Sequence, residues 1–251
     1  MSDTQPPHVV DPLDGHPHTH SIIFLHGRDS INNEFADELF ESEASEPAGQ
    51  PRTLRDLFPT IRWVFPAAPT LHSARFDTDM SQWFDIWSVE EPAKEGHIQH
   101  EGLRTSAAAV LDVVRGEEAR VQGGRQRIFV AGISQGFATV VAASLLAAMD
   151  GQEGFAGLVG LSSWMPLGTK DELVRVLAGD GTAVLDSMPN TPVFLGHSKD
   201  DEIVPVQNGR ALRDILNAHQ EVEWHEYEDG GHWVNEPQGI DDIADFLRRH
   251  M

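Results

Sequence analysis

The chain has 251 residues, 40% of them hydrophobic and 23% charged, which is typical of a globular protein large enough to bury a sizeable core. Its net charge of -22 at pH 7 argues against nucleic acids and anionic membranes as partners, because their phosphates would be repelled. The sequence contains no cysteine, which excludes disulfides, thiol nucleophiles and thiolate metal sites and suits a reducing compartment, so a cytoplasmic location is expected.

The first 20 residues are rich in proline and histidine, and we expect them to form a flexible lead-in to a single domain over residues 21–251. They lack the basic segment and the apolar segment of a secretory signal. No stretch of the sequence approaches the ~20 apolar residues of a membrane span, so we expect no stable membrane insertion. The imidazoles of "HPHTH" (residues 16–20) could ligate a divalent metal, but no strongly acidic partner adjoins them and no metal site is expected.

Beyond the lead-in, short apolar runs alternate with stretches whose apolar residues have helical spacing. The runs, which are typical of buried parallel strands, are residues 21–27, 61–69, 127–133, 155–163, 191–198 and 222–228. The predicted helices are residues 103–121, 137–150, 208–219 and 240–250. This alternation predicts an α/β fold, with a mostly parallel sheet that is covered by helices on both faces.

The predicted connections are an exposed loop over residues 41–52 and two long irregular stretches, residues 70–102 and 164–190. Ligands of open parallel sheets bind outside the carboxyl ends of the strands, where such connections lie. The functional residues are therefore sought at those strand ends.

The segment "VAGISQGFA" (residues 130–138) places Ser134 between two glycines, directly after a predicted strand and directly before a predicted helix. A Gly-x-Ser-x-Gly sequence in this context is typical of a nucleophilic serine, because the sharp turn pushes the hydroxyl outward and the glycines avoid clashes. The pentapeptide alone would equally fit a serine in an ordinary tight turn. The flanking strand and helix favour Ser134 as a nucleophile.

A nucleophilic serine needs a base that takes its proton, and in this architecture the chain order is serine, acid, histidine. His232 lies in the glycine-rich segment "EDGGHWV" after the last predicted strand, where a loop can carry an imidazole to the carboxyl edge of the sheet. His197 precedes the acid candidates, while His219 and His225 lie in a helix end and a strand, where structural roles are expected. His232 is therefore the predicted base.

The carboxylate that orients this base belongs in the loop after the strand at residues 191–198. The segment "HSKDDEIVP" offers Asp200, Asp201 and Glu202 there, and position alone does not separate these three neighbours. For two of them, plain solvation is the expected role.

The tetrahedral intermediate of such a reaction needs two backbone N–H donors. One donor is expected from Gln135, the residue after the nucleophile. The other is expected from Arg28 in "FLHGRDS" (residues 24–30), where a strand runs into a glycine that allows close approach. His26 in the same segment is expected to pack within the loop.

Together these pieces resemble the acyl-protein thioesterase, or phospholipase/carboxylesterase, branch of the α/β-hydrolases. The matching segments, in chain order, are "FLHG", "PAAPT", "MSQWFDIW", "AGISQG", "GLVGLSSWMP", "HSKDDEIVP" and "GGHW". The resemblance implies an α/β-hydrolase fold and a carboxylic-ester or thioester hydrolase that needs no metal or other cofactor. It implies a small-molecule ester or an acylated protein or lipid as substrate, and it allows a homodimer.

The resemblance also assigns roles to individual residues. In the family an aspartate precedes a Val-Pro pair by three positions, as Asp201 precedes Val204-Pro205 here, so Asp201 becomes the predicted acid. Further matches to the family's substrate-binding segments are Trp83, Trp164, Met165 and Ile203. Core packing is the alternative role for each, and for Phe84, beside Trp83, it is the expected one.

The sequence departs from the family pattern at Arg28-Asp29-Ser30 instead of Leu-Gly-Asp, at Ser198 instead of glycine, and at Trp233, where a small residue is usual. Arg28 at the mouth of the groove would disfavour long lipid tails or would attract a carboxylate or another anion. These departures favour a carboxylesterase for short or compact esters as the alternative to a thioesterase for long acyl chains. The alternative outside enzymes is a ligand receptor, which would not need a complete serine, aspartate and histidine set.

Overall fold

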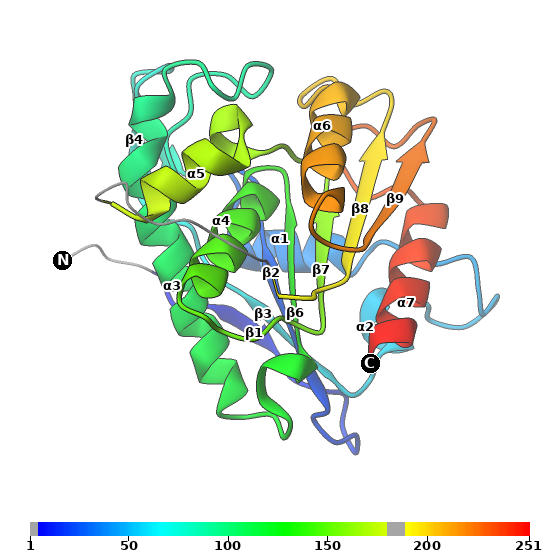
Figure 1. Ribbon diagram of the computed structural model, residues 1–251. Coiled ribbons are helices and arrows are strands. Elements are labelled where there is room, and N and C mark those ends of the chain that lie inside the picture. Colours follow the sequence, from blue (N-terminus) through cyan, green and yellow to red (C-terminus); the bar gives the residue numbers. More distant parts are fainter. Residues whose placement is uncertain (1–4, 180–188) are drawn as a thin grey trace.

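A computed structural model describes residues 5–179 and 189–251 of the chain (Figure 1). Its central sheet has seven strands in the spatial order β1-β3-β2-β6-β7-β8-β9. The strands are β1 (His8–Val10), β2 (His20–Leu25), β3 (Ile61–Phe65), β6 (Ile128–Ile133), β7 (Gly157–Leu161), β8 (Val193–Ser198) and β9 (Val222–Tyr227). Only β1 runs antiparallel to its neighbour, and the six predicted strands form one parallel array, so the predicted fold class is confirmed.

Helices cover both faces of this sheet (Figure 1). One face carries α3 (His100–Glu118), α4 (Gln135–Met149), α5 (Lys170–Leu177) and α6 (Val206–Asn217), and the other carries α1 (Asn32–Leu39), α2 (Leu54–Leu57) and α7 (Gln238–His250). Side chains alternate between the two cores along each strand: in β2, Ile23 and Leu25 join the first, and Ile22 and Phe24 join the second. Burial on both faces explains why these strands are continuous apolar runs in the sequence.

Several elements differ from the sequence predictions. The expected flexible lead-in is wrong for residues 8–10, since β1 pairs with β3 and closes the edge of the sheet. The predicted irregular stretch over residues 70–102 contains a hairpin of β4 (Thr70–Ser73) and β5 (Thr78–Ser81). The irregular stretch over residues 164–190 contains α5, and its residues 180–188 lie outside the described residues. Helices α1 and α2 were not predicted.

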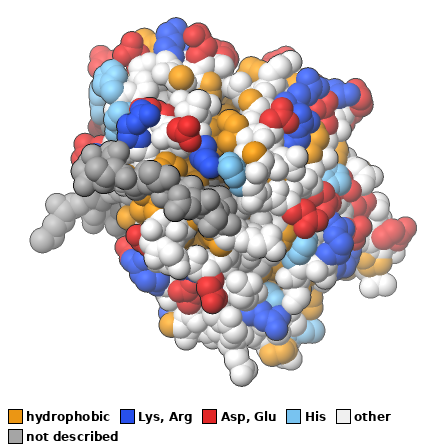
Figure 2. All heavy atoms as spheres, in the orientation of Figure 1, with side chains coloured by type: hydrophobic (Ala, Val, Ile, Leu, Met, Phe, Trp, Pro, Cys, Tyr) orange, Lys and Arg blue, Asp and Glu red, His pale blue; other side chains and the backbone are white. Residues whose placement is uncertain are grey.

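The surface is strongly charged but mixed in sign. On the face shown in Figure 2, acidic side chains lie beside basic ones. An ion pair between α6 and β9 is an example of mixed charge: Arg210 contacts the carboxylate of Glu226 at 2.6 and 2.8 Å. Over residues 5–179 and 189–251, none of the helices is both long and apolar enough to cross a bilayer.

Candidate active site

Ser134 lies at the carboxyl end of β6, in the turn that leads directly into α4. Its backbone has φ 56° and ψ -126°, a conformation that strains any residue other than glycine. Two hydrogen bonds hold the strained peptide: the Ser134 N–H donates to Leu161 O at 2.8 Å, and Ser163 Oγ donates to Ser134 O at 2.7 Å. The neighbouring strand β7 and the segment after it thus fix the turn that presents the hydroxyl.

The two glycines around Ser134 are required because backbone fills the space where their side chains would lie. A Cβ on Gly132 would lie 2.4 Å from the backbone nitrogen of Phe137. A Cβ on Gly136 would lie 2.3 Å from the carbonyl oxygen of Leu25, at the end of β2. The turn after β6 therefore packs directly against the end of the neighbouring strand.

We expect Gly136→Ala to destabilise the fold by about 3 kcal/mol or more, because the backbone of Leu25 and His26 at the end of β2 cannot move away from the added methyl group. Gly116→Ala is the matched control, since this exposed glycine lies in α3 with nothing within 4 Å of the added carbon. The control should be stabilised by about 0.5–1 kcal/mol, the helix preference for alanine. Urea unfolding of both variants measures the difference, and equal stabilities would contradict this account of the turn.

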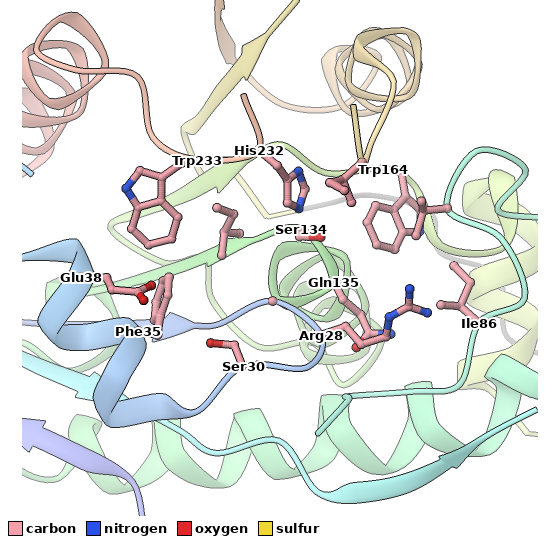
Figure 3. A pocket seen from close by; sticks show the side chains of 14 residues that line it. Arg28, Ser30, Phe35, Glu38, Ile86, Ser134, Gln135, Trp164, His232 and Trp233 are labelled. Atoms are coloured by element: carbon pink, nitrogen blue, oxygen red, sulfur yellow. The ribbon is translucent and has the colours of Figure 1, made fainter. Parts of the chain in front are cut away.

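His232 and Asp201 come together at the carboxyl edge of the sheet. The Nδ1 atom of His232 lies 2.7 Å from Oδ2 of Asp201, and because a carboxylate only accepts, Nδ1 carries the donated proton. The other oxygen of Asp201 accepts the N–H groups of Ile203 at 2.9 Å and Val204 at 2.8 Å. This leaves Nε2 of His232 available as an acceptor, and Figure 3 shows the imidazole beside the side chain of Ser134.

The structure also distinguishes the three neighbouring acid candidates. Asp201 is buried against His232, whereas Glu202 is exposed. Asp200 has a separate contact, because its Oδ1 accepts the Gly231 N–H at 2.9 Å and so ties the histidine loop to the loop after β8.

His197 is a residue of this site that the sequence reasoning did not assign. Its side chain is 1% exposed, and its Nε2 donates to Val204 O at 2.9 Å while lying 3.3 Å from Oδ2 of Asp201. Burial raises the pKa of Asp201, but the hydrogen bonds from His197 and His232 outweigh burial and hold that pKa well below its usual range. The available signal was the spacing of four residues between His197 and Asp201.

Hydrogen bonds connect the loop that carries Arg28 to Trp83, and connect the segment of Trp83 to Gln135. The indole N–H of Trp83 donates to His26 O at 2.9 Å, and the imidazole of His26 accepts the Ala68 N–H at 3.1 Å. The buried amide of Gln135 accepts the Trp83 N–H at 2.9 Å and donates to Phe84 O at 2.7 Å. These contacts fix the relative positions of the two segments expected to supply the N–H donors.

A cavity of about 220 Å³ lies over Ser134 and His232 (Figure 3). Arg28, Gln135, Trp164 and Ile203 also line it, as four of the predicted site residues. Trp83 and Met165 do not belong to its lining, so the substrate contact predicted for these two residues is not found there. Both are buried in the core, as is Phe84, and Trp83 instead borders a larger cavity of about 550 Å³ near β4, to which the predicted catalytic residues do not contribute.

The loop of His232 is braced by the first third of the chain. The indole of Trp233 packs edge-on against Phe35 of α1, with ring centroids 5.7 Å apart, and its N–H lies 3.3 Å from Ser42 Oγ. The same Ser42 hydroxyl donates to the carboxylate of Glu236 at 2.9 Å. Both Phe35 and Trp233 also line the cavity, so the unusual tryptophan closes one end of it.

Comparison with known proteins gives consistent relatives. The phospholipase/carboxylesterase family profile matches residues 7–251. Acyl-protein thioesterase 1 of Yarrowia lipolytica is 30% identical over 92% of this chain and 90% of that protein. Acyl-protein thioesterase 1 of Gibberella zeae is 26% identical over 93% of this chain and 92% of that protein. Among solved structures, acyl-protein thioesterase 2 of Zea mays has a TM-score of 0.71 and 24% identity, covering 97% of this chain and 98% of that one, which shows a shared fold.

Proposed function

Since the chain belongs to the phospholipase/carboxylesterase family, it is a hydrolase of esters or thioesters, and we propose that Ser134 is the nucleophile that cleaves them. The observation that carries the proposal is the contact of 2.7 Å between His232 Nδ1 and the buried carboxylate of Asp201, beside a serine in a strained turn. This contact fixes the tautomer whose Nε2 can accept a proton from the serine.

In the proposed reaction, His232 Nε2 takes the proton of Ser134 Oγ while this oxygen attacks the carbonyl carbon of the substrate. The carbonyl oxygen becomes an oxyanion, which the backbone N–H groups of Arg28 and Gln135 stabilise. The intermediate collapses to an acyl-enzyme, and His232 returns the proton to the leaving alcohol or thiol. A water molecule, deprotonated by His232, then attacks the acyl carbon; the bond to Ser134 Oγ breaks, His232 returns the proton to this oxygen, and the acid is released. Asp201 stabilises the imidazolium during both steps.

The substrates that the cavity favours are compact esters. A volume of about 220 Å³ is below the ~300–1,000 Å³ of typical small-molecule sites, and Phe35 and Trp233 close one end of it. Long acyl chains, which the names of the acyl-protein thioesterase relatives suggest, would need a longer groove. Cleavage of an acylated protein or lipid therefore stays the second candidate.

A chain-length series tests this choice. With p-nitrophenyl acetate, butyrate, octanoate and palmitate, we expect kcat/KM to be highest at acetate or butyrate. The value of kcat/KM should fall about tenfold or more by octanoate, because methylene groups that do not fit the cavity weaken binding of the transition state. Trp233→Ala, which removes an indole from the wall, should move the maximum to longer chains. A rate that rises through palmitate, or a strong preference for long acyl thioesters, would instead favour the acyl-protein thioesterase activity.

Three other features remain proposals. A cytoplasmic location is supported by the cysteine-free sequence. A single domain over residues 21–251 is supported by one sheet that includes strands from β2 to β9. A homodimer is supported by the family resemblance alone.

The alternative function outside enzymes is a non-catalytic receptor. Labelling with a fluorophosphonate would reveal it, because a receptor without an activated Ser134 would stay unlabelled.

A further inference from the structure

The side chain of Arg28 brings a positive charge to the catalytic cavity. It is half-buried and lines the cavity beside Trp164 and Ile86 (Figure 3). Within residues 5–179 and 189–251, no carboxylate oxygen lies within 4 Å of its guanidinium, although the chain has 40 acidic residues and 18 basic ones. A guanidinium keeps its charge at any pH at which proteins fold.

A second arginine increases this positive charge. The guanidinium of Arg28 lies 5.2 Å from the centre of the Phe76 ring, and that of Arg75 lies 5.4 Å from the same centre. Arg75 also donates to Trp87 O at 2.8 Å, which fixes its position. Two cations on one ring repel each other, and each gains only a weak attraction from the aromatic face. The arrangement would be relieved by an anion between the cavity and this pair.

Two acidic groups, Asp85 and Asp29, offset part of the charge of Arg28 without contacting its guanidinium. Burial and the charge of Arg75 lower the pKa of the Arg28 guanidinium, while Asp85 and Asp29 raise it from a distance. One oxygen of Asp85 already accepts the Ala74 N–H at 3.0 Å. Within the described residues, the guanidinium of Arg28 therefore keeps N–H groups that a ligand in the cavity could accept.

The opposite end of the cavity has the other sign. Glu38 of α1 lines it beside Phe35 and Trp233, and Figure 3 shows Glu38 and Arg28 on opposite sides of Ser134. A carboxylate on the substrate would be attracted toward Arg28 and repelled from Glu38. The opposite charges at the two ends of the cavity would thus favour one orientation of a substrate that carries a charge at one end.

We propose that the substrate is a compact ester with a free carboxylate, and that the Arg28 guanidinium binds this carboxylate while Ser134 attacks the ester carbonyl. The inference rests on the ester hydrolysis proposed above. A guanidinium forms two parallel hydrogen bonds with a carboxylate, so the contact fixes orientation as well as charge. The ring of Phe76 holds the guanidinium at the cavity, and the charge of Arg75 adds to the attraction for an anion.

The test compares esters of equal shape and different charge. Monomethyl succinate and methyl 4-oxopentanoate differ in a carboxylate or a methyl ketone on the acyl side. Acetoxyacetate and acetoxyacetone have the same difference on the alcohol side. Released acid is followed by titration at constant pH, and the measured quantity is the ratio of kcat/KM between the charged and the neutral member of each pair.

We expect Arg28→Gln to lower this ratio about tenfold or more in one of the two pairs, because the variant loses the charge-assisted hydrogen bonds to the carboxylate. The pair that responds shows which side of the ester carries the carboxylate. Arg28→Lys should keep part of the preference, since it keeps the charge and loses the bidentate geometry. Arg115→Gln is the matched control, since it removes an exposed arginine that pairs with Asp112 on α3, and its ratio should stay within about twofold of the original.

Comparing ratios separates binding of the carboxylate from damage to the nearby oxyanion contacts, which would slow both members of a pair equally. Ratios that Arg28→Gln leaves unchanged in both pairs, in a protein that still hydrolyses the neutral esters, would overturn the inference while the proposed function stands. A protein that hydrolyses none of the four esters, and whose Ser134 does not react with a fluorophosphonate, would overturn both.

Discussion

Replacing Ser134 by alanine is expected to lower kcat for ester hydrolysis by about 10⁴- to 10⁶-fold, because the nucleophile, its base and its orienting acid act as one unit. The activity that remains would come from substrate binding and from the backbone donors at Arg28 and Gln135. The variant should also lose covalent labelling by a fluorophosphonate. Single-turnover assays with an activated ester, together with intact-mass analysis of the labelled protein, measure both effects.

Ser134→Gly separates this chemical effect from an effect on folding. The backbone conformation at residue 134, with φ 56° and ψ -126°, is strained for serine, whereas glycine adopts it easily. The glycine variant should therefore be at least as stable as the original protein, and about 1–3 kcal/mol more stable if most of the strain is released. It should nevertheless be as inactive as the alanine variant. Hydrolysis at a near-normal rate by either variant would refute the role of Ser134.

Asp201→Asn is expected to lower kcat by about 10³- to 10⁴-fold, because an asparagine no longer fixes the tautomer of His232 or stabilises its charged form. Glu202→Gln is the matched control: it removes a neighbouring carboxylate that is exposed, and it should change kcat less than about twofold. Steady-state kinetics with one ester for both variants measures the contrast. Equal losses in the two variants would mean that the acid has been misassigned.

Asp201→Asn should also change the pH dependence of stability. Folding lowers the pKa of Asp201, so the charged carboxylate stabilises the fold. This stabilisation is fully present at pH values above the pKa of an aspartate in the unfolded chain, which is about 4. This contribution is lost as the pH falls through the pKa of the folded state. The free energy of unfolding of the original protein should therefore decline more steeply below pH 5 than that of Asp201→Asn. Parallel curves would show that the folded protein does not favour the charged carboxylate.

The parts of the site that the sequence predicted are those fixed by local geometry. Two positions around Ser134, those of Gly132 and Gly136, have no room for a side chain where β6 turns into α4. The sequence shows this requirement directly, as a Gly-x-Ser-x-Gly pattern after an apolar run. Strands buried on both faces could also be predicted, because neither face needs polar residues and each strand is therefore a continuous apolar run. His232 was predicted from the chain order together with its glycine-rich loop after the last predicted strand.

The parts that could not be predicted depend on packing between distant segments. Trp83 and Trp164 both stand in motifs near the site, but only the fold shows that the Trp83 indole turns inward to His26 O while Trp164 lines the cavity. The contact of His197 with Asp201 was hidden because a histidine at the end of a strand equally fits simple core packing. The short helix α1 was missed, although its buried residues Phe35, Ala36 and Leu39 have helical spacing.

The bracing of the His232 loop by Phe35 and Ser42 has a consequence during protein synthesis. Segments from the first and the last fifths of the chain must meet before the imidazole is held in place, and contacts this far apart in sequence form slowly. A growing polypeptide on the ribosome would carry the serine turn long before it carried its base. A product that ends before residue 232 would therefore carry Ser134 without its proposed base, and we expect it to cleave no esters.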